Sequence, residues 1–548
     1  MEMKNKQPTV SVVLLWNKDV PYKAGEFTKT IESILENYYP AKEVIVVDNT
    51  GKRPKKPWIG RKKSLARKVK FVAGKFKNRA ASFNAGIKKA KGDYIALVDS
   101  LENAIQFRKS ALDCFVMAAE RNPDASMIYS DYERIASDGS LDEVHLLPYH
   151  EGRLRDAVDF GKVLFFPAKM LRKLRYVKDK YDAADWYDLR LRASEKGRLV
   201  GVSNRFNGSL YSVYEQAGEF DVFYYLKAGK DTQLELEKAC TEHLKRVKAY
   251  LAPGQNYKAV KYSPKEEKQF KCLFSVVIPV FNRPEFIANA IDSVQAQTLG
   301  KKVEVIVVCN GGPDDPTVDA VKEYMKGGEK YDKKKSSVDL IVTDINNLGL
   351  CFNLGLKKAR GKYYLQLDSD DQLTPDAAEK VLEVYESDPT VGMVIGSYEV
   401  WVKDKKGKIK RDESMPVVTH GEWTDKNGRN NLLRINGAGA PRSAHIKVIR
   451  NVGWFGCNDE PYCRNYGEDY DLVCRITEQY RMGRVWEPIY KVVRHEGGTD
   501  HSPDQYTIDL NDNAKDHMRY MALQRRKAIN AKAKPKKKSK SRSKKKKK

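Results

Sequence analysis

The chain has 548 residues, of which 41% are hydrophobic and 10% aromatic, so it is long and apolar enough for roughly two to four folded domains. This composition excludes a single small module and a disordered chain. The net charge is +27, from 100 Lys and Arg against 73 Asp and Glu, but 12 of the basic residues lie in the short tail 532–548. The overall charge is therefore weak support for nucleic-acid binding.

The start of the chain and its apolar runs indicate where in the cell the protein is found. Residues 1–8 are polar and lead directly into an apolar run, which does not fit a secretory signal. No apolar run approaches the length of about 18 residues that a membrane-spanning helix needs. The eight cysteines are scattered, which favours free thiols in a reducing compartment. We therefore expect a cytoplasmic protein that is peripheral to a membrane where it contacts one.

The chain contains the same pattern twice. Residues 78–102 and 347–371 share 11 of 25 positions without a gap. The match extends to two pairs of apolar runs that precede these segments, 10–17 with 275–282 and 44–51 with 305–312. A separation of about 265 residues is too long for a solenoid repeat, so the pattern indicates a duplicated domain.

Within each copy, short apolar runs alternate with amphipathic patterns. In the second copy the predicted strands cover 276–280, 303–308, 340–342 and 363–367, and the predicted helices cover 286–294 and 351–359. This alternation predicts an α/β domain with a mainly parallel sheet flanked by helices. Ligands of such sheets bind at the carboxyl ends of the strands, where Asn282, Asn310 and Asp368 fall.

These patterns divide the chain into five parts. We expect an α/β domain over 1–224, a helical linker over 225–270, a second α/β domain over 271–504, a C-terminal helix over 505–530 and a disordered Lys-rich tail over 531–548.

Three carboxylates follow the last predicted strand of the second copy, at Asp368, Asp370 and Asp371. Neighbouring carboxylates repel one another unless a cation lies between them. Oxygen ligands of this kind suit a hard cation such as Mg²⁺ or Mn²⁺. A solvated acidic turn or a helix N-cap is the alternative interpretation.

Two more acids and a histidine lie further along. Glu468 and Asp469 open an amphipathic helix, where acids either stabilise the helix dipole or supply a general base. His495 follows an apolar run that resembles a strand, and it can be a structural residue or a ligand.

Five segments of the second copy stand in a specific order: SVVIPVFNR, VIVVCNGG, NLGLCFNLGLKKARGKYYLQLDSDD, GEDYDLVCRI and VVRHEGG. In this order they resemble glycosyltransferase family 2, which has the GT-A fold; the resemblance is strong over 274–500 and weaker over 9–220. It implies an inverting, metal-dependent enzyme that moves a sugar from a nucleotide-diphosphate sugar, here a UDP-sugar, to a hydroxyl of a glycan or lipid-linked acceptor.

The resemblance also assigns roles to residues. Asp368 and Asp370 match the family's metal-binding acids, and His495 matches a residue that completes the metal or diphosphate site, with Mn²⁺ or Mg²⁺ as the cofactor. Asp469 matches the catalytic base, with Glu468 as the alternative. The residues matched to nucleotide-sugar binding are Pro279, Phe281, Asn310, Asn347 and Asp368. Cys309 departs from the family, since many members carry Asp there.

The first copy keeps the pattern but changes these positions. Leu101, Trp186 and Gln216 stand where the second copy has a metal ligand, the base and the histidine. A leucine cannot bind a cation and an indole cannot accept a proton, so we expect the first copy to be non-catalytic. Two alternatives stay open. In the first alternative, both copies are active, and Asp185 and Glu102 serve from shifted positions. In the second, the protein binds polyanions or nucleic acid on an inactive transferase scaffold.

Basic residues gather in two segments, 50–77 and the C-terminal tail. Solvated surface loops are the simplest explanation. The functional interpretation is contact with an anionic membrane surface, an acidic glycan or a phosphorylated lipid carrier. We do not expect a nucleic-acid partner.

Overall fold

The computed structural model describes residues 7–17, 19–50, 67–204, 208–214, 229–403, 408–421, 427–435, 437, 439–495 and 504–533. The chain divides into two compact units. Unit 1 comprises residues 1–243 and 433–435, and unit 2 comprises residues 244–432 and 436–548. Gln216, most of the basic segment 50–77 and the tail from residue 534 lie outside the described residues.

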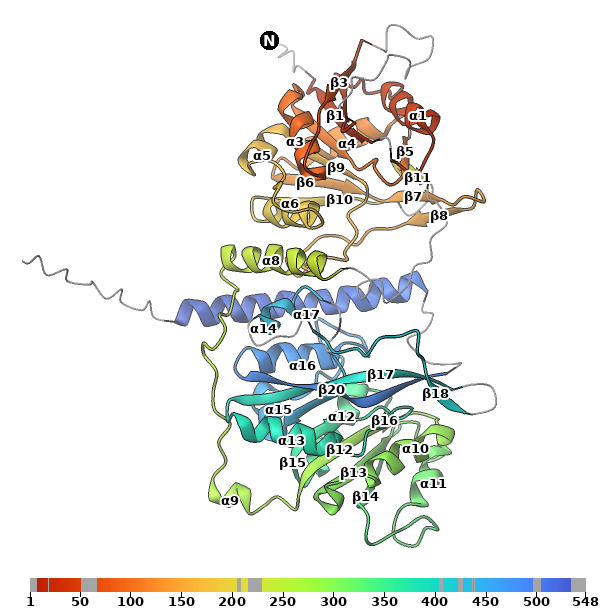
Figure 1. Ribbon diagram of the computed structural model, residues 1–548, viewed down its shortest axis with the longest axis vertical. Helices are drawn as coiled ribbons and strands as arrows, with labels where there is room; N and C mark the ends of the chain where they lie inside the picture. The colour runs from red at the N-terminus through yellow and green to blue at the C-terminus, as the bar shows by residue number, and fades with distance from the viewer. Residues whose placement is uncertain are drawn as a thin grey trace, which may run out of the picture. The chain divides into compact units, whose positions relative to one another are not determined.

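Unit 1 has a large and a small sheet (Figure 1). The strands of the large sheet are β1 (Val10–Trp16), β2 (Glu43–Asp48), β3 (Val69–Ala73), β4 (Tyr94–Val98), β6 (Ala125–Ser130), β9 (Val163–Pro167) and β10 (Arg198–Val202). The small sheet contains β5 (Ala104–Phe107), β7 (Tyr132–Ile135), β8 (Leu141–Val144) and β11 (Tyr211–Tyr214). The helices are α1 (Ala24–Leu35), α3 (Arg79–Lys89), α4 (Ala111–Arg121), α5 (Ala168–Lys173), α6 (Asp185–Ser194) and α8 (Lys230–Arg246).

Unit 2 is built on one sheet of nine strands. Its strands are β12 (Cys272–Val280), β13 (Val303–Cys309), β14 (Val338–Val342), β15 (Gly361–Gln366), β16 (Gln372–Leu373), β17 (Val391–Lys403), β18 (Ile409–Arg411), β19 (Arg442–His445) and β20 (Arg481–Arg494). The helices are α9 (Pro264–Glu267), α10 (Pro284–Gln295), η1 (Gly300–Lys302), α11 (Thr317–Lys322), α12 (Leu348–Lys358), α13 (Ala377–Ser387), α14 (Gly428–Asn431), α15 (Ile446–Val452), α16 (Glu468–Thr477) and α17 (Gln505–Lys532).

The two large sheets have the same strand order. In unit 1 the order is β3-β2-β1-β4-β9-β6-β10, and in unit 2 it is β14-β13-β12-β15-β19-β17-β20, with β16 added at the far edge. In each sheet the third strand pairs in parallel with both of its neighbours, and the fifth strand is antiparallel to the strands beside it. The predicted α/β fold, a mainly parallel sheet flanked by helices and built twice, is confirmed.

The apolar runs form the central strands because both faces of the sheet are covered. Every residue of β1 is buried, and so are six of the nine residues of β12. On one face a helix approaches the central strand closely through a glycine. A Cβ atom on Gly86 would lie 2.4 Å from Val13 Cγ1, and one on Gly355 would lie 2.3 Å from Val277 Cγ1. Both copies therefore require glycine at this contact.

An asparagine clamp, made by Asn84 in unit 1 and Asn353 in unit 2, also occurs in both copies. The Asn84 side chain donates to Val177 O at 2.8 Å and accepts from Val177 N at 3.0 Å. Asn353 does the same with Phe455, at 3.0 Å and 3.1 Å. Each amide thus satisfies the backbone of a distant loop, which fixes that loop against the helix.

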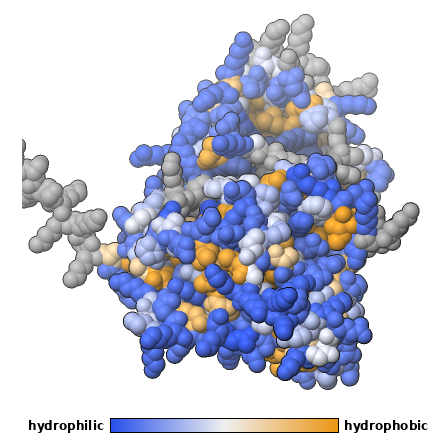
Figure 2. Space-filling model, turned by 60° about the horizontal axis from the view of Figure 1, so that its bottom comes forward, coloured by the Kyte–Doolittle hydropathy of each residue, from blue (hydrophilic) through white to orange (hydrophobic). Residues whose placement is uncertain are grey.

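Two predictions concern the surface and the cysteines. No helix in the described part of the chain is both long and apolar enough to cross a membrane. The face in Figure 2 is mostly hydrophilic, with apolar side chains in separate patches. All eight cysteines are free thiols, as expected.

Candidate active site

The candidate site of unit 2 lies where neighbouring strands of the sheet end. β12 leads into Phe281–Arg283, β13 into Asn310, and β15 into the acidic turn Asp368–Asp371. Because β13, β12 and β15 are adjacent and parallel, these segments meet at one edge of the sheet.

The acidic turn is anchored by β20. The Asp368 N–H donates to the Tyr490 hydroxyl at 3.0 Å, and the buried Asp371 accepts from Val493 N at 2.8 Å. Burial and the charges of Asp368 and Asp370 raise the pKa of Asp371 well above its usual range. Burial also raises the pKa of Asp368, an effect that a hydrogen bond from Gln366 opposes. Asp371 therefore fixes the turn, and Asp368 and Asp370 are the acids left for a ligand.

Asp370 has two cationic or potentially cationic neighbours. Its Oδ2 lies 3.1 Å from His495 Nε2, so the structure brings together two residues predicted to bind metal that are 125 positions apart. The same oxygen forms an ion pair with the Arg283 guanidinium. Phe286 holds the imidazole in place, with ring centroids 4.2 Å apart.

The two acids at the start of α16 have different environments. Burial disfavours the charge on Asp469, but Arg442, whose Nη2 lies 2.8 Å from Asp469 Oδ2, holds its pKa below the ordinary value. Burial and the charge on Asp469 raise the pKa of Glu468 to about 7. At neutral pH Asp469 is therefore ionised and can accept a proton, whereas the pKa of Glu468 lies closer to neutrality, where a general base is most efficient.

Arg442 links the two groups of acids. It begins β19, the strand beside β15, and its backbone N–H donates to Gln366 at 3.3 Å. Its charge opposes the rise in the pKa of Asp368 as well as lowering that of Asp469. The acidic turn and the start of α16 therefore belong to one site.

The residues predicted to bind the nucleotide differ in exposure. The Phe281 ring is 52% exposed at the end of β12. Asn310 donates from Nδ2 to Asn346 Oδ1 at 3.0 Å, while its own buried Oδ1 has no partner within the described residues. Pro279 lies inside β12, in register with Val308. The Phe281 ring is thus open to a ligand, whereas the unpaired amide oxygen of Asn310 is buried.

Asn347 has a structural role in the fold. It caps α12, accepting from Leu350 N at 2.9 Å and donating to Cys457 O at 2.9 Å. Its predicted contact with a nucleotide sugar stays a prediction.

The sequence reasoning missed Arg283 and Arg442. Arg283 closes the segment SVVIPVFNR, so its position next to a strand end was a usable signal. Arg442 lies in no recognised motif, and only the pairing of β19 with β15 brings it to the acids.

Comparisons with known proteins decide the family. A family model described as "Glycosyl transferase family 2" matches residues 20–139 and 275–451, together more than half of the chain. The chain belongs to glycosyl transferase family 2. It is therefore a glycosyltransferase, and its α/β units have the GT-A fold.

The chain is also similar to individual proteins. An uncharacterized glycosyltransferase from Rickettsia felis is 24% identical over 535 residues, which cover 92% of this chain and 82% of the relative. Two solved structures are more distant. S. aureus TarS 1–349 in complex with UDP-GlcNAc is 18% identical, with a TM-score of 0.33 and 47% of this chain and 73% of that chain covered. The mannosyltransferase PcManGT from Pyrobaculum calidifontis, in complex with GDP-Man and Mn²⁺, is 16% identical, with a TM-score of 0.31 and coverages of 56% and 84%.

The family-2 site of unit 2 suits a divalent cation. The described residues hold no ready-made group of three His, Cys, Asp or Glu ligands. Asp370 and His495 nevertheless face each other, with Asp368 in the same turn. One or two carboxylates completed by substrate phosphates are a common way to hold Mg²⁺ or Mn²⁺. The Arg283 guanidinium already places a positive charge at Asp370, where a cation would lie.

In unit 1 the acids at the positions matched to Asp368 and Glu468 hold an arginine. Arg79 Nη1 lies 2.6 Å from Asp99 Oδ2, and its Nε donates to Asp185 Oδ2 at 3.0 Å. A further ion pair joins Arg79 Nη2 to Asp185 Oδ1. The guanidinium also lies against the Trp186 ring, 5.5 Å from its centroid. A fixed internal cation therefore lies between the two acids of unit 1.

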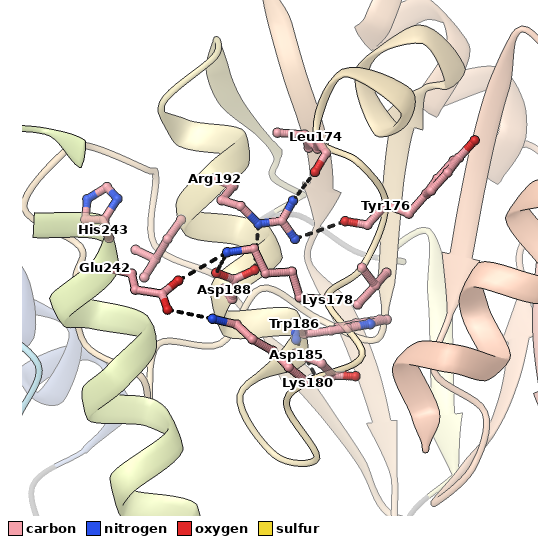
Figure 3. A network of polar contacts seen from close by, with 12 residues as sticks. Leu174, Tyr176, Lys178, Lys180, Asp185, Trp186, Asp188, Arg192, Glu242 and His243 are labelled. Carbon is pink, nitrogen blue, oxygen red and sulfur yellow. Dashed lines mark hydrogen bonds and ion pairs between the residues drawn. The ribbon is translucent and has the colours of Figure 1, made fainter. Parts of the chain in front are cut away.

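The helix that carries Asp185 and Trp186 is held by a polar network (Figure 3). Asp188 is fully buried and pairs with Arg192 Nε at 2.6 Å and Lys178 Nζ at 3.3 Å. Lys178 in turn pairs with Glu242 at 3.2 Å. Glu102, considered as a substitute acid, is 76% exposed and lies 3.6 Å from Lys162. The network stabilises the fold of unit 1 around this helix.

Proposed function

We propose that unit 2 is the transferring unit, an inverting and divalent-metal-dependent glycosyltransferase that uses a nucleotide-diphosphate sugar. The observation that carries this proposal is the presence of two separate acidic groups in one site. Asp370 faces His495, which suits a cation and a diphosphate. Asp469 is held ionised by Arg442, which suits proton removal.

The reaction follows from these positions. The acceptor hydroxyl oxygen attacks the anomeric carbon on the face opposite the diphosphate and gives its proton to Asp469. The new carbon–oxygen bond forms as the bond to the diphosphate oxygen breaks, so the configuration inverts without a covalent intermediate. A divalent cation held by Asp370, with His495 and Asp368, would neutralise the departing diphosphate.

The donor is proposed to be a UDP-sugar. The exposed Phe281 ring offers a stacking surface for a base, and each stacked base adds roughly 1–3 kcal/mol in proteins that bind single strands. The free Oδ1 of Asn310 can accept a hydrogen bond from the N3–H of uracil. The acceptor is proposed to be a glycan or a lipid-linked sugar, in agreement with the family.

Unit 1 is proposed not to transfer sugar. Its acids are bridged by Arg79, and Leu101 and Trp186 replace a ligand and the base. An arginine held between two carboxylates excludes a second cation from the same place, because like charges repel.

A thermal-stability screen of nucleotide sugars with and without Mn²⁺ tests the proposal. We expect a UDP-sugar to stabilise the full chain in a metal-dependent way, by about 2.7 kcal/mol at one hundred times its dissociation constant. Asp370→Asn should abolish the metal-dependent part and all transfer. Leu101→Asn introduces the same amino acid at the matched position of unit 1 and is the control. It should change neither the metal-dependent stabilisation nor the transfer. Transfer that survives Asp370→Asn would contradict the assignment to unit 2.

A further inference from the structure

Arg283 combines a fixed backbone with a long side chain next to the acidic turn. Its N–H donates to Thr317 Oγ1 at 2.9 Å, and the preceding Asn282 N–H donates to Asp315 Oδ2 at 2.8 Å. The side chain is 20% exposed and reaches Asp370, 87 positions away. The backbone is therefore anchored, while rotation about the side-chain bonds can move the guanidinium.

Arg283 and a divalent cation compete for the same carboxylate. The guanidinium and the His495 imidazole both approach Asp370 Oδ2. A cation bound there through Asp370 and His495 would lie next to the guanidinium, and the two positive charges would repel each other. Metal binding at Asp370 therefore requires Arg283 to leave.

The donor itself provides the next partner. A nucleotide-diphosphate sugar whose diphosphate were held by a cation at Asp370 would bring negatively charged phosphate oxygens near Arg283. The planar guanidinium matches phosphate geometry with two parallel hydrogen bonds, so it binds phosphate more specifically than an ammonium group does.

We propose that Arg283 is a placeholder: it neutralises Asp370 in the empty site, gives way to the divalent cation and then binds the donor diphosphate. This inference rests on the proposed function of unit 2 and adds a donor-binding residue to it. The alternative is a purely structural ion pair, which would stabilise the fold without opposing the metal.

Titration of the full chain with Mn²⁺ in the absence of donor distinguishes the placeholder role from a purely structural ion pair. Free Mn²⁺ is followed by electron paramagnetic resonance. Binding is taken as the part that Asp370→Asn removes. We expect Arg283→Gln to bind Mn²⁺ about tenfold more tightly than the natural chain, because the competing charge is gone. At saturating Mn²⁺ we expect the same variant to bind UDP about tenfold more weakly.

Arg283→Lys is the matched control, because it keeps the charge but loses the planar fork. We expect its Mn²⁺ affinity to stay near that of the natural chain and its UDP affinity to fall. Unchanged or weaker Mn²⁺ binding by a folded Arg283→Gln variant would overturn the placeholder role. Equal Mn²⁺ binding by the natural chain and Asp370→Asn would instead overturn the metal site in the proposed function.

Discussion

Units 1 and 2 share a strand order and an asparagine clamp, but they hold their acids with different cations. In unit 1 one arginine, Arg79, binds both acids at once. Its matched position in unit 2 is Leu348, and two other arginines, Arg283 and Arg442, each bind one acid. In unit 1 a single arginine thus occupies the space between two acids, whereas in unit 2 each acid has an arginine of its own.

The two units also differ in the groups that they present where a nucleotide base would bind. Phe281 follows the end of β12 and is 52% exposed, whereas Trp16, the last residue of β1, is 9% exposed and packs on Phe27, with centroids 4.6 Å apart. Asn310 Oδ1 has no partner within the described residues, whereas Asn49 Oδ1 accepts from Phe76 N at 2.7 Å. In unit 1 these groups are thus occupied by contacts with its own side chains and backbone, whereas in unit 2 they have no such partner within the described residues.

Replacing the proposed base is the strongest way to break the comparison. Asp469→Asn should lower kcat by about 10²–10⁴-fold, because the amide cannot take the acceptor's proton. Donor affinity, measured by calorimetry with UDP and Mn²⁺, should change little. Trp186→Phe is the matched variant in unit 1 and should leave kcat unchanged; a comparable loss there would mean that both units transfer.

Removing the internal cation of unit 1 should have the next largest effect. Arg79→Leu installs the residue of unit 2 and leaves Asp99 and the fully buried Asp185 without a counter-charge. We expect a loss of about 3 kcal/mol in the free energy of unfolding, measured by calorimetry. Arg79→Lys should lose less, because it keeps the charge.

A second substitution sharpens this test. In an Asp370→Asn background, Arg79→Leu combined with Leu101→Asp should recover stability when Mn²⁺ is added, because the acids of unit 1 then have access to a cation. No response to Mn²⁺ would show that Arg79 is not what keeps metal out of unit 1.

The smallest expected effect concerns the pH dependence of transfer. Arg442→Met removes the charge that opposes burial at Asp469, so the pKa of Asp469 should rise. The base acts only when ionised, and the acidic limb of kcat/KM should therefore move to higher pH, by about 1–3 units. An unmoved limb would show that Asp469 does not set it.

The sequence predicted the duplicated fold well because its signals are local. Buried parallel strands require continuous apolar runs, and the two copies supply these runs in the same order. The approach of Asp370 to His495 agrees with roles that the family resemblance had already suggested.

The arginines could not be predicted in the same way. Each ion pair joins elements far apart in the chain, and the choice of partner is decided by tertiary packing rather than by a local pattern. Asn347 shows the opposite case. An asparagine directly before a helix is a local capping signal, and the structure uses it as a cap.

The asparagine clamp has a consequence for engineering the protein. Asn84 and Asn353 bind their loops in the same way, although unit 1 has Leu101 and Trp186 at the positions matched to Asp370 and Asp469. The segments 78–102 and 347–371 therefore each carry an equivalent attachment point for a distant loop. A chimera in which 347–371 replaces 78–102 would inherit the acidic turn and keep an asparagine at the attachment point.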